Sequence, residues 1–215
     1  MRRILFEKLG PSVWMSHLDT MRLMQRAFRR AGVLLHHSQG YTPHAYVSMP
    51  MPLSVGTESL CEIMEYELDT DLAISAEQLN AVLPEGVRVL SVYESPLKIK
   101  HLSRLQAQLR LFYDEGISEN AVSEIAKLLS QESIVIEKRT KRGMEETDIR
   151  PLLHSATIKR EGHTLVIDCE VSAQNPPLNP MLLVSAIETH LPQLKPNHAK
   201  CRRIEIFDAE GHVFR

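Results

Sequence analysis

Residues 16–32, SHLDTMRLMQRAFRRAG, predict the first long helix of the chain, and this helix determines how the segments on either side are interpreted. Ser16 followed three residues later by Asp19 is a capping box, in which Ser16 is the N-cap and Asp19 reaches back to its amide. Gly32 ends the helix, because glycine readily adopts the left-handed conformation found just past a helix end. The apolar residues at helical spacing share one side, which we expect to face the core: Met21, Met24, Ala27, Phe28 and Ala31.

The segments around this helix predict a βαββαβ unit over residues 1–96. A second capping box, Ser75 with Gln78, begins the second helix, which Pro84 and Gly86 end. Glu94-Ser95-Pro96 is the expected linker to the rest of the chain. The expected strands span residues 3–8, 34–38, 62–68 and 87–93.

The same order of elements recurs over residues 97–215, without a residue-level repeat. Residues 105–113 alternate apolar with polar side chains and predict a strand with a basic polar face. Further strands are expected at 134–139, 156–159, 164–171 and 201–208, and helices at 118–130 and 179–190. The sequence thus predicts an α+β fold of tandem ferredoxin-like architecture, with two antiparallel sheets, each covered by helices on one face and open on the other.

Composition narrows the classes of function. The chain has 25 Lys and Arg against 27 Asp and Glu, so any affinity for nucleic acid must come from a local patch. Three cysteines, Cys61, Cys169 and Cys201, form no CxxC pair, which favours buried reduced thiols over a zinc site. The charged first residues and the lack of a long apolar run indicate a soluble cytoplasmic protein. Nucleotide-binding, metalloprotease, hydrolase and iron–sulfur motifs are absent from the sequence.

Four arginines form the polar side of the first helix and cover about a third of its circumference. All four basic positions are Arg and none is Lys, the choice expected where planar, bidentate contact to phosphate or carboxylate matters. Asp19 is the only acid in the helix, so local pairing leaves most of this charge free. Binding of an anion or a partner and a merely solvated helix face are both open: the residues are Arg22, Arg26, Arg29 and Arg30.

The loop that follows, residues 36–56, is long for a connection inside a compact domain, and such loops are often functional. Tyr41 and Tyr46 could stack on bases, and His44 could act as a general acid or base. The alternative is an ordered cover over the sheet, with these side chains bound to backbone groups. His17 lies near the loop if the helix and loop pack together.

The densest basic run is Lys138-Arg139-Thr140-Lys141-Arg142, and an acidic stretch follows it. A second basic patch would let the two units hold one strand of RNA, or one partner surface, between them. A plain exposed loop is the alternative, and we expect Asp148 and Arg150 to pair and fix it.

Three stretches, HLDTMRLMQRAFRRAG, SQGYTPHAYVSMPMPLSVGTES and KRGMEETDIRP, give the chain a resemblance to the radical SAM-associated (radical SAM-linked) protein family. Members of that family occur alone or as C-terminal domains of cobalamin-binding radical SAM proteins, and they have no established activity. The resemblance therefore implies a radical SAM partner, which would carry the iron–sulfur cluster, S-adenosylmethionine and cobalamin, with no cofactor or metal in this chain. Tyr41 and Thr42 stand where the family has phenylalanine and asparagine. The positions that match the family motif are His17, Asp19, Arg22, Arg26, Arg30, Gly40, Pro43, His44 and Gly56.

Three functions are compatible with these features. The first is a non-catalytic accessory subunit that binds RNA, such as tRNA or rRNA, and presents it to a radical SAM enzyme. The second is a subunit that docks an acidic surface of that enzyme without RNA. The third is a metal-independent RNA endonuclease, in which His44 acts with His17 or His36 and Arg26 stabilises the phosphorane.

Overall fold

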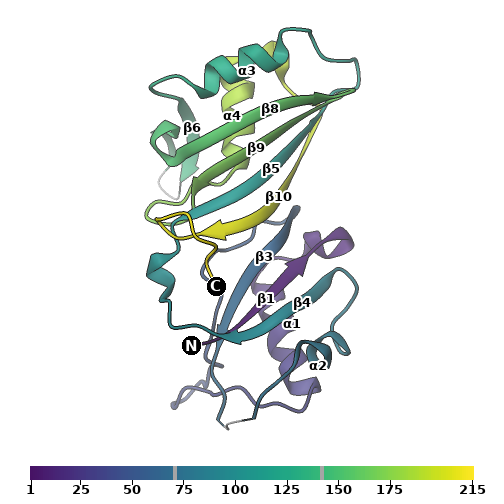
Figure 1. The fold of residues 1–215 in the computed structure, drawn as a ribbon, viewed down its shortest axis with the longest axis vertical. Helices are drawn as coiled ribbons and strands as arrows, with labels where there is room; N and C mark the ends of the chain where they lie inside the picture. The colour runs from purple at the N-terminus through teal and green to yellow at the C-terminus, as the bar shows by residue number, and fades with distance from the viewer. Residues whose placement is uncertain (70–71, 141–142) are drawn as a thin grey trace. The chain divides into compact units, whose positions relative to one another are not determined.

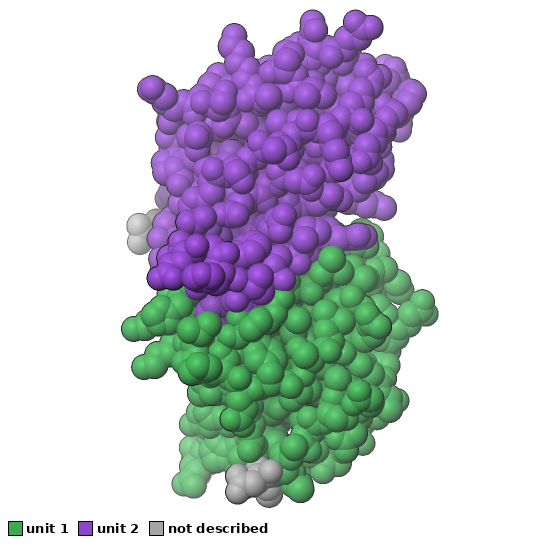
Figure 2. All heavy atoms as spheres, in the orientation of Figure 1, with its two compact units in different colours: residues 1–101, 215 green, residues 102–214 purple. Residues whose placement is uncertain are grey.

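The computed structural model describes residues 1–69, 72–140 and 143–215, without the side chains of residues 139 and 140. Within these ranges the chain mixes α-helices with a sheet that is mostly antiparallel. It divides into two compact units, residues 1–101 with residue 215, and residues 102–214, which are coloured separately in Figure 2. The division predicted from the sequence was at residue 96.

The first unit has the element order β1 (Arg2–Lys8), α1 (His17–Arg30), β2 (Val47–Ser48), β3 (Thr57–Tyr66), α2 (Ala76–Asn80) and β4 (Val87–Glu94), with a 3-10 turn at Gly10–Trp14. β1 pairs with β4 on one side and with β3 on the other, and β2 pairs with β3. Both helices lie on one face of this sheet (Figure 1). Met24 and Phe28 of α1 pack there with Ile4, Phe6 and Tyr66 in the core.

The two helix starts predicted in the first unit are confirmed. Ser16 caps α1 by accepting a hydrogen bond from the amide of Asp19, and Ser75 and Gln78 form both bonds of the second capping box. Gly32 has a φ of +78°, as expected for a residue just past the end of a helix.

The strand predicted at 34–38 is wrong. Leu35 and His37 make only single bridges, with Leu68 and Ala45. The edge of β3 pairs instead with Val47 and Ser48, opposite Tyr66 and Glu65. The local run Leu34-Leu35 resembles a strand, but the partner of β3 is decided by contacts that a local pattern does not contain.

The second unit contains β5 (Arg104–Phe112), α3 (Ala121–Leu129), β8 (Leu153–Glu161), β9 (Thr164–Ser172), α4 (Met181–His190) and β10 (His198–Phe207). β5 pairs with β10 and β9, and β9 pairs with β8. A separate hairpin, β6 (Val135–Thr140) with β7 (Gly143–Asp148), precedes β8. Short 3-10 turns lie at Ile99–His101, Arg150–Leu152 and Pro192–Leu194.

In the second unit the structure differs from the sequence prediction in two further respects. The basic face predicted for the first strand is neutralised, because Arg104 pairs with Glu170 at 3.0 Å and Arg110 with Glu161 at 3.1 Å. Residues 164–167 of β9 are all buried, so both faces of the sheet are covered there, whereas the prediction left one face open.

The three cysteines are buried, as predicted, and burial raises the pKa of the thiols of Cys169 and Cys201 to about 12. None of the helices in the described ranges has the length and apolar composition needed to cross a lipid bilayer.

Candidate functional site

The side of α1 that carries arginines and the hairpin formed by residues 35–45 enclose a cleft of about 410 Å³ in the first unit. The hairpin is closed by a bridge between His37 and Ala45 and by a hydrogen bond of 2.8 Å from the amide of Ser38 to the carbonyl of His44. The hydroxyl of Ser38 also accepts from the amide of His44 at 3.0 Å. We call this hollow the arginine cleft; it is lined by Arg22, Gln25, Arg26, Arg29, Val33, Leu34, Leu35, His37, Pro43, His44 and Ala45.

The helix period selects which arginines reach the cleft. Arg22, Gln25, Arg26 and Arg29 follow the spacing i, i+3, i+4, i+7, which forms one stripe along a helix. Arg30 follows Arg29 directly and is therefore rotated by about 100° around the axis. Arg30 is exposed but does not line the cleft.

The cleft carries uncompensated positive charge. None of the described residues that line it has a carboxylate. Asp19 lies 3.5 Å from Arg22 in an exposed pair and also accepts a hydrogen bond of 2.6 Å from the Ser16 hydroxyl, which lowers the pKa of the Asp19 carboxyl. Within the part of the chain that the structure describes, the guanidinium groups of Arg26 and Arg29 make no hydrogen bond or ion pair. Their charge is available to an anion from solution.

Two histidines line the cleft, His44 and His37. His44 is exposed, and His37 was not among the predicted site residues. Nδ1 of His37 lies 2.7 Å from the carbonyl oxygen of Leu35, so in the neutral ring Nδ1 carries the proton and Nε2 is an acceptor. The register His37 with Ala45 brings His37 to the cleft, and only the closed hairpin could reveal this register.

The histidines proposed as catalytic partners of His44 lie elsewhere. His17 is half-buried at the start of α1 and does not line the cleft. His36 binds Asp69 through Nδ1 and stacks on Tyr46 with ring centroids 5.0 Å apart. The cleft does not assemble His44 with either of them.

The remaining predicted residues lie on the hairpin, at Gly56 and in the second unit. Tyr41 projects fully exposed from the hairpin tip beside Gly40, whose φ of +142° suits glycine, and Pro43 lines the cleft. Gly56 lies outside the cleft, where its amide donates to the carbonyl of Val13 at 2.8 Å. Lys138 is exposed on β6 in the second unit. The side chain of Arg139, and Lys141 and Arg142 entirely, lie outside the described residues.

The acidic stretch after this basic run forms β7, which was not predicted. The Asp148 carboxylate accepts hydrogen bonds from the amides of Ile134 at 2.8 Å and Arg150 at 3.0 Å. These bonds lower the pKa of Asp148, Ile134 contributing most. The guanidinium of Arg150 donates to the carbonyls of Gln131 and Leu153, so the predicted contact between Asp148 and Arg150 is made by the Arg150 amide. In the described ranges, no group of three His, Cys, Asp or Glu side chains is arranged to hold a metal ion.

The chain aligns with several solved structures. One chain of "Crystal Structure of a Cbf5-Nop10-Gar1 Complex" aligns with a TM-score of 0.52 and 10% identity over 97% of this chain and 50% of that one. A chain of "Structure of H/ACA RNP bound to a substrate RNA containing 2'-deoxyuridine" aligns at a TM-score of 0.46 and 10% identity, covering 93% and 46% of the two chains. An unknown protein from Galdieria sulphuraria aligns at a TM-score of 0.22 and 10% identity, covering 94% of this chain and 96% of that one.

The chain thus spans about half the length of the first two solved chains. At 10% identity, the likeness to the first of them concerns the fold alone. No curated protein matches the sequence. Residues 2–180 match the family described as "Uncharacterized protein conserved in bacteria (DUF2344)". Because this match covers most of the chain, the protein belongs to the DUF2344 family.

Proposed function

We propose that the protein is a non-catalytic accessory subunit that binds single-stranded RNA, such as a loop of tRNA or rRNA, in the arginine cleft. The observation that carries the proposal is the stripe of three arginines facing the hairpin across a cleft without carboxylates. Guanidinium groups bind phosphate oxygens in a bidentate, charge-assisted geometry. The apolar wall formed by Val33, Leu34 and Leu35 lowers the local dielectric, which strengthens each of these contacts.

The exposed ring of Tyr41 favours RNA over an acidic protein surface. The hairpin holds this tyrosine at its tip, where the structure gives it no apolar surface to cover. An exposed aromatic ring on the same hairpin as the cleft residues Pro43 and His44 offers the kind of surface on which the bases of single-stranded nucleic acid stack. The proposal that a radical SAM enzyme receives the RNA is supported by the sequence motifs of residues 17–32 and 38–59.

The histidine pairs suggested by the sequence for cleavage are not assembled, because His17 and His36 are not in the cleft with His44. His37 is the histidine that lines the cleft with His44, so a cleavage assay must test these two residues together. Metal-independent cleavage of RNA by the purified protein, lost on the change His44→Ala, would overturn the non-catalytic assignment.

We expect Arg26 and Arg29 to be required for binding and Arg30 to be dispensable. The double change Arg26→Ala and Arg29→Ala removes two phosphate contacts, so the affinity for a fluorescein-labelled single-stranded RNA should fall by about tenfold or more. Fluorescence anisotropy measures this loss. Arg30→Ala is the matched control on the same helix, and its affinity should stay within about twofold of the unmodified protein.

Equal losses in the double variant and in Arg30→Ala would show that the cleft is not the binding site. A pull-down from cells with and without ribonuclease treatment then separates RNA binding from direct docking. The docking alternative would be favoured if a partner protein is retained after ribonuclease treatment and the untreated pull-down contains no RNA.

We further propose that each unit has the ferredoxin-like βαββαβ architecture. The first unit has the strand order β4-β1-β3-β2 and the second β10-β5-β9-β8, both antiparallel, with the β6–β7 hairpin as an addition to the second. Failure of either unit to superpose on a ferredoxin-like domain in an experimental structure would contradict this assignment.

A further inference from the structure

The hairpin that closes the arginine cleft also borders a second hollow. This pocket of about 350 Å³ lies between the hairpin and β3, and Tyr46, Ser48, Glu65 and Glu67 are among its lining residues. His44 and Ala45 line both hollows. The two hollows therefore adjoin at His44 and Ala45, and a ligand that occupies both must cross this wall.

One wall of the pocket is an ordered aromatic ring. Tyr46 is about half exposed, and its ring stacks on His36 at an interplanar angle of 29°. The backbone around it is also fixed, because the Tyr46 amide donates to the carbonyl of His36 at 2.8 Å and the Glu67 amide donates to the carbonyl of Tyr46 at 3.1 Å. A ring held in this way offers a stacking surface that loses little entropy when a planar group binds.

The pocket, unlike the cleft, has carboxylates in its lining. The Glu65 carboxylate is engaged, since Nε and Nη2 of Arg3 donate to it at 3.0 and 2.8 Å. Glu67 is exposed, and its carboxylate has no hydrogen bond or ion pair among residues 1–69, 72–140 and 143–215. A carboxylate repels phosphate and accepts hydrogen bonds only, so it selects a group that presents N–H donors.

We propose that the pocket receives one unpaired base of the RNA whose phosphate lies in the arginine cleft, and that Glu67 selects a base with an exocyclic amino group. This inference rests on the proposed function. The Glu67 carboxylate and the arginines of the cleft orient the nucleotide, with its phosphate toward Arg26 and its base toward Glu67. Adenine and cytosine present an exocyclic amino group to such an acceptor, whereas uracil offers only its N3–H, which lies between two carbonyl oxygens that a carboxylate repels.

The test compares three fluorescein-labelled RNAs of equal length, oligo(A), oligo(C) and oligo(U), on the full chain by fluorescence anisotropy. We expect oligo(A) and oligo(C) to bind about tenfold more tightly than oligo(U), which is the discrimination of one good contact to a base edge. In Glu67→Gln the preference should fall below about threefold, because an amide both donates and accepts.

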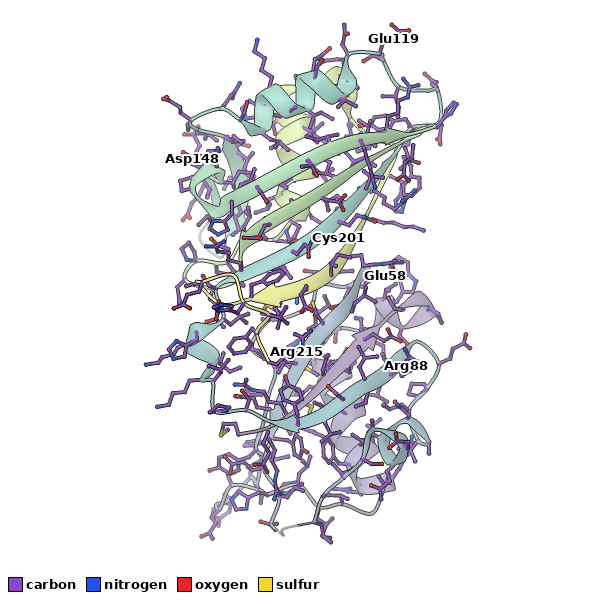
Figure 3. The ribbon with its side chains drawn as sticks, viewed as in Figure 1. Glu58, Arg88, Glu119, Asp148, Cys201 and Arg215 are labelled. Atoms are coloured by element: carbon purple, nitrogen blue, oxygen red, sulfur yellow. The ribbon has the colours of Figure 1, made fainter. Side chains whose placement is uncertain are left out.

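Glu119→Gln is the matched control, since it removes the same charge at an exposed position in the loop ahead of α3, in the second unit (Figure 3). This variant should keep the preference of the unmodified protein. Circular dichroism checks that each variant is folded. Because the side chain of Glu67 is exposed, we expect Glu67→Gln to fold like the unmodified protein.

The outcomes separate this inference from the proposed function. Equal binding of all three RNAs, or a preference that persists in Glu67→Gln, overturns the base pocket and leaves RNA binding in the cleft intact. Absence of binding to any RNA overturns the proposed function, and the base pocket with it.

Discussion

Gly86 has a φ of +87°, and a Cβ at this position would lie 2.5 Å from the carbonyl oxygen of Leu9 and 2.6 Å from Oγ of Ser12. The same place is fixed by hydrogen bonds from the Leu9 amide to the carbonyl of Gly86 and from the Ser12 hydroxyl to the carbonyl of Glu85. A side chain here must therefore displace backbone that is already bonded.

We expect Gly86→Ala to lower the free energy of unfolding by about 2 kcal/mol or more, because positive φ and a backbone clash act together. Urea denaturation followed by circular dichroism measures the change. Gly116→Ala is the matched control: its φ is +93°, but the nearest atom to its Cβ is 3.9 Å away in His163. If both variants lose the same stability, the contact with Leu9 and Ser12 contributes nothing.

Tyr41 is the second residue whose role can be isolated, since its exposed ring contributes little to folding. Tyr41→Ala should change the free energy of unfolding by less than about 0.5 kcal/mol. RNA affinity should fall by about 5- to 150-fold, the range of a lost stacking contact, in an anisotropy titration. Tyr41→Phe should retain the affinity, and an equal loss in that variant would assign the role to the hydroxyl and not to the ring.

Local signals in the sequence predicted individual helices well, and failed where pairing is non-local. Ser16 and Ser75 cap the helices that they were expected to cap, because a capping box involves only four consecutive residues. β7 was missed, because residues 143–148 are charged and mostly exposed, and only pairing with β6 orders them as a strand. In the candidate site, helical periodicity predicted one face of four arginines. The position of Arg30 outside the cleft and the contribution of His37 depend on how the hairpin closes, which the local pattern does not contain.

The β6–β7 hairpin gives a prediction at the scale of an element. Asp148 ends β7 and bonds to the amide of Ile134, just ahead of β6, and these bonds lower its pKa from the ordinary value of 3.8. A carboxyl with a lowered pKa stabilises the fold above pH 3.8, and this contribution is lost as the pH falls below that value.

We therefore expect the melting temperature of Asp148→Asn to be lower than that of the unmodified protein at pH 6, and the two to converge toward pH 3. Thermal unfolding followed by circular dichroism at a series of pH values tests this. Glu119→Gln, which removes a carboxyl without these bonds, should follow the unmodified protein throughout. A gap between Asp148→Asn and the unmodified protein that is as wide at pH 3 as at pH 6 would contradict the assigned bonds.

For the whole molecule, the balance of charges sets the salt dependence of binding. With 25 basic and 27 acidic residues, the protein as a whole does not attract a polyanion, so only local contacts release counterions. Three arginines in contact with single-stranded phosphates give a slope of log K against log salt concentration of about −2.

We expect anisotropy titrations across a range of salt concentrations to give this slope. The double change Arg26→Ala and Arg29→Ala should reduce it to about −0.7, because one phosphate contact remains. A much steeper slope in the unmodified protein would show that basic groups beyond the cleft, such as those of residues 138–142, also bind the RNA.

Trp14 is the single tryptophan of the chain and is 73% exposed, with its ring edge near Gly56. An indole that is already solvated in the native protein emits much as it does in the unfolded chain. Intrinsic fluorescence is thus a poor reporter of unfolding for this protein. Trp14 lies just ahead of α1, so the same emission is suited to follow events at the N-terminal end of that helix in the native state.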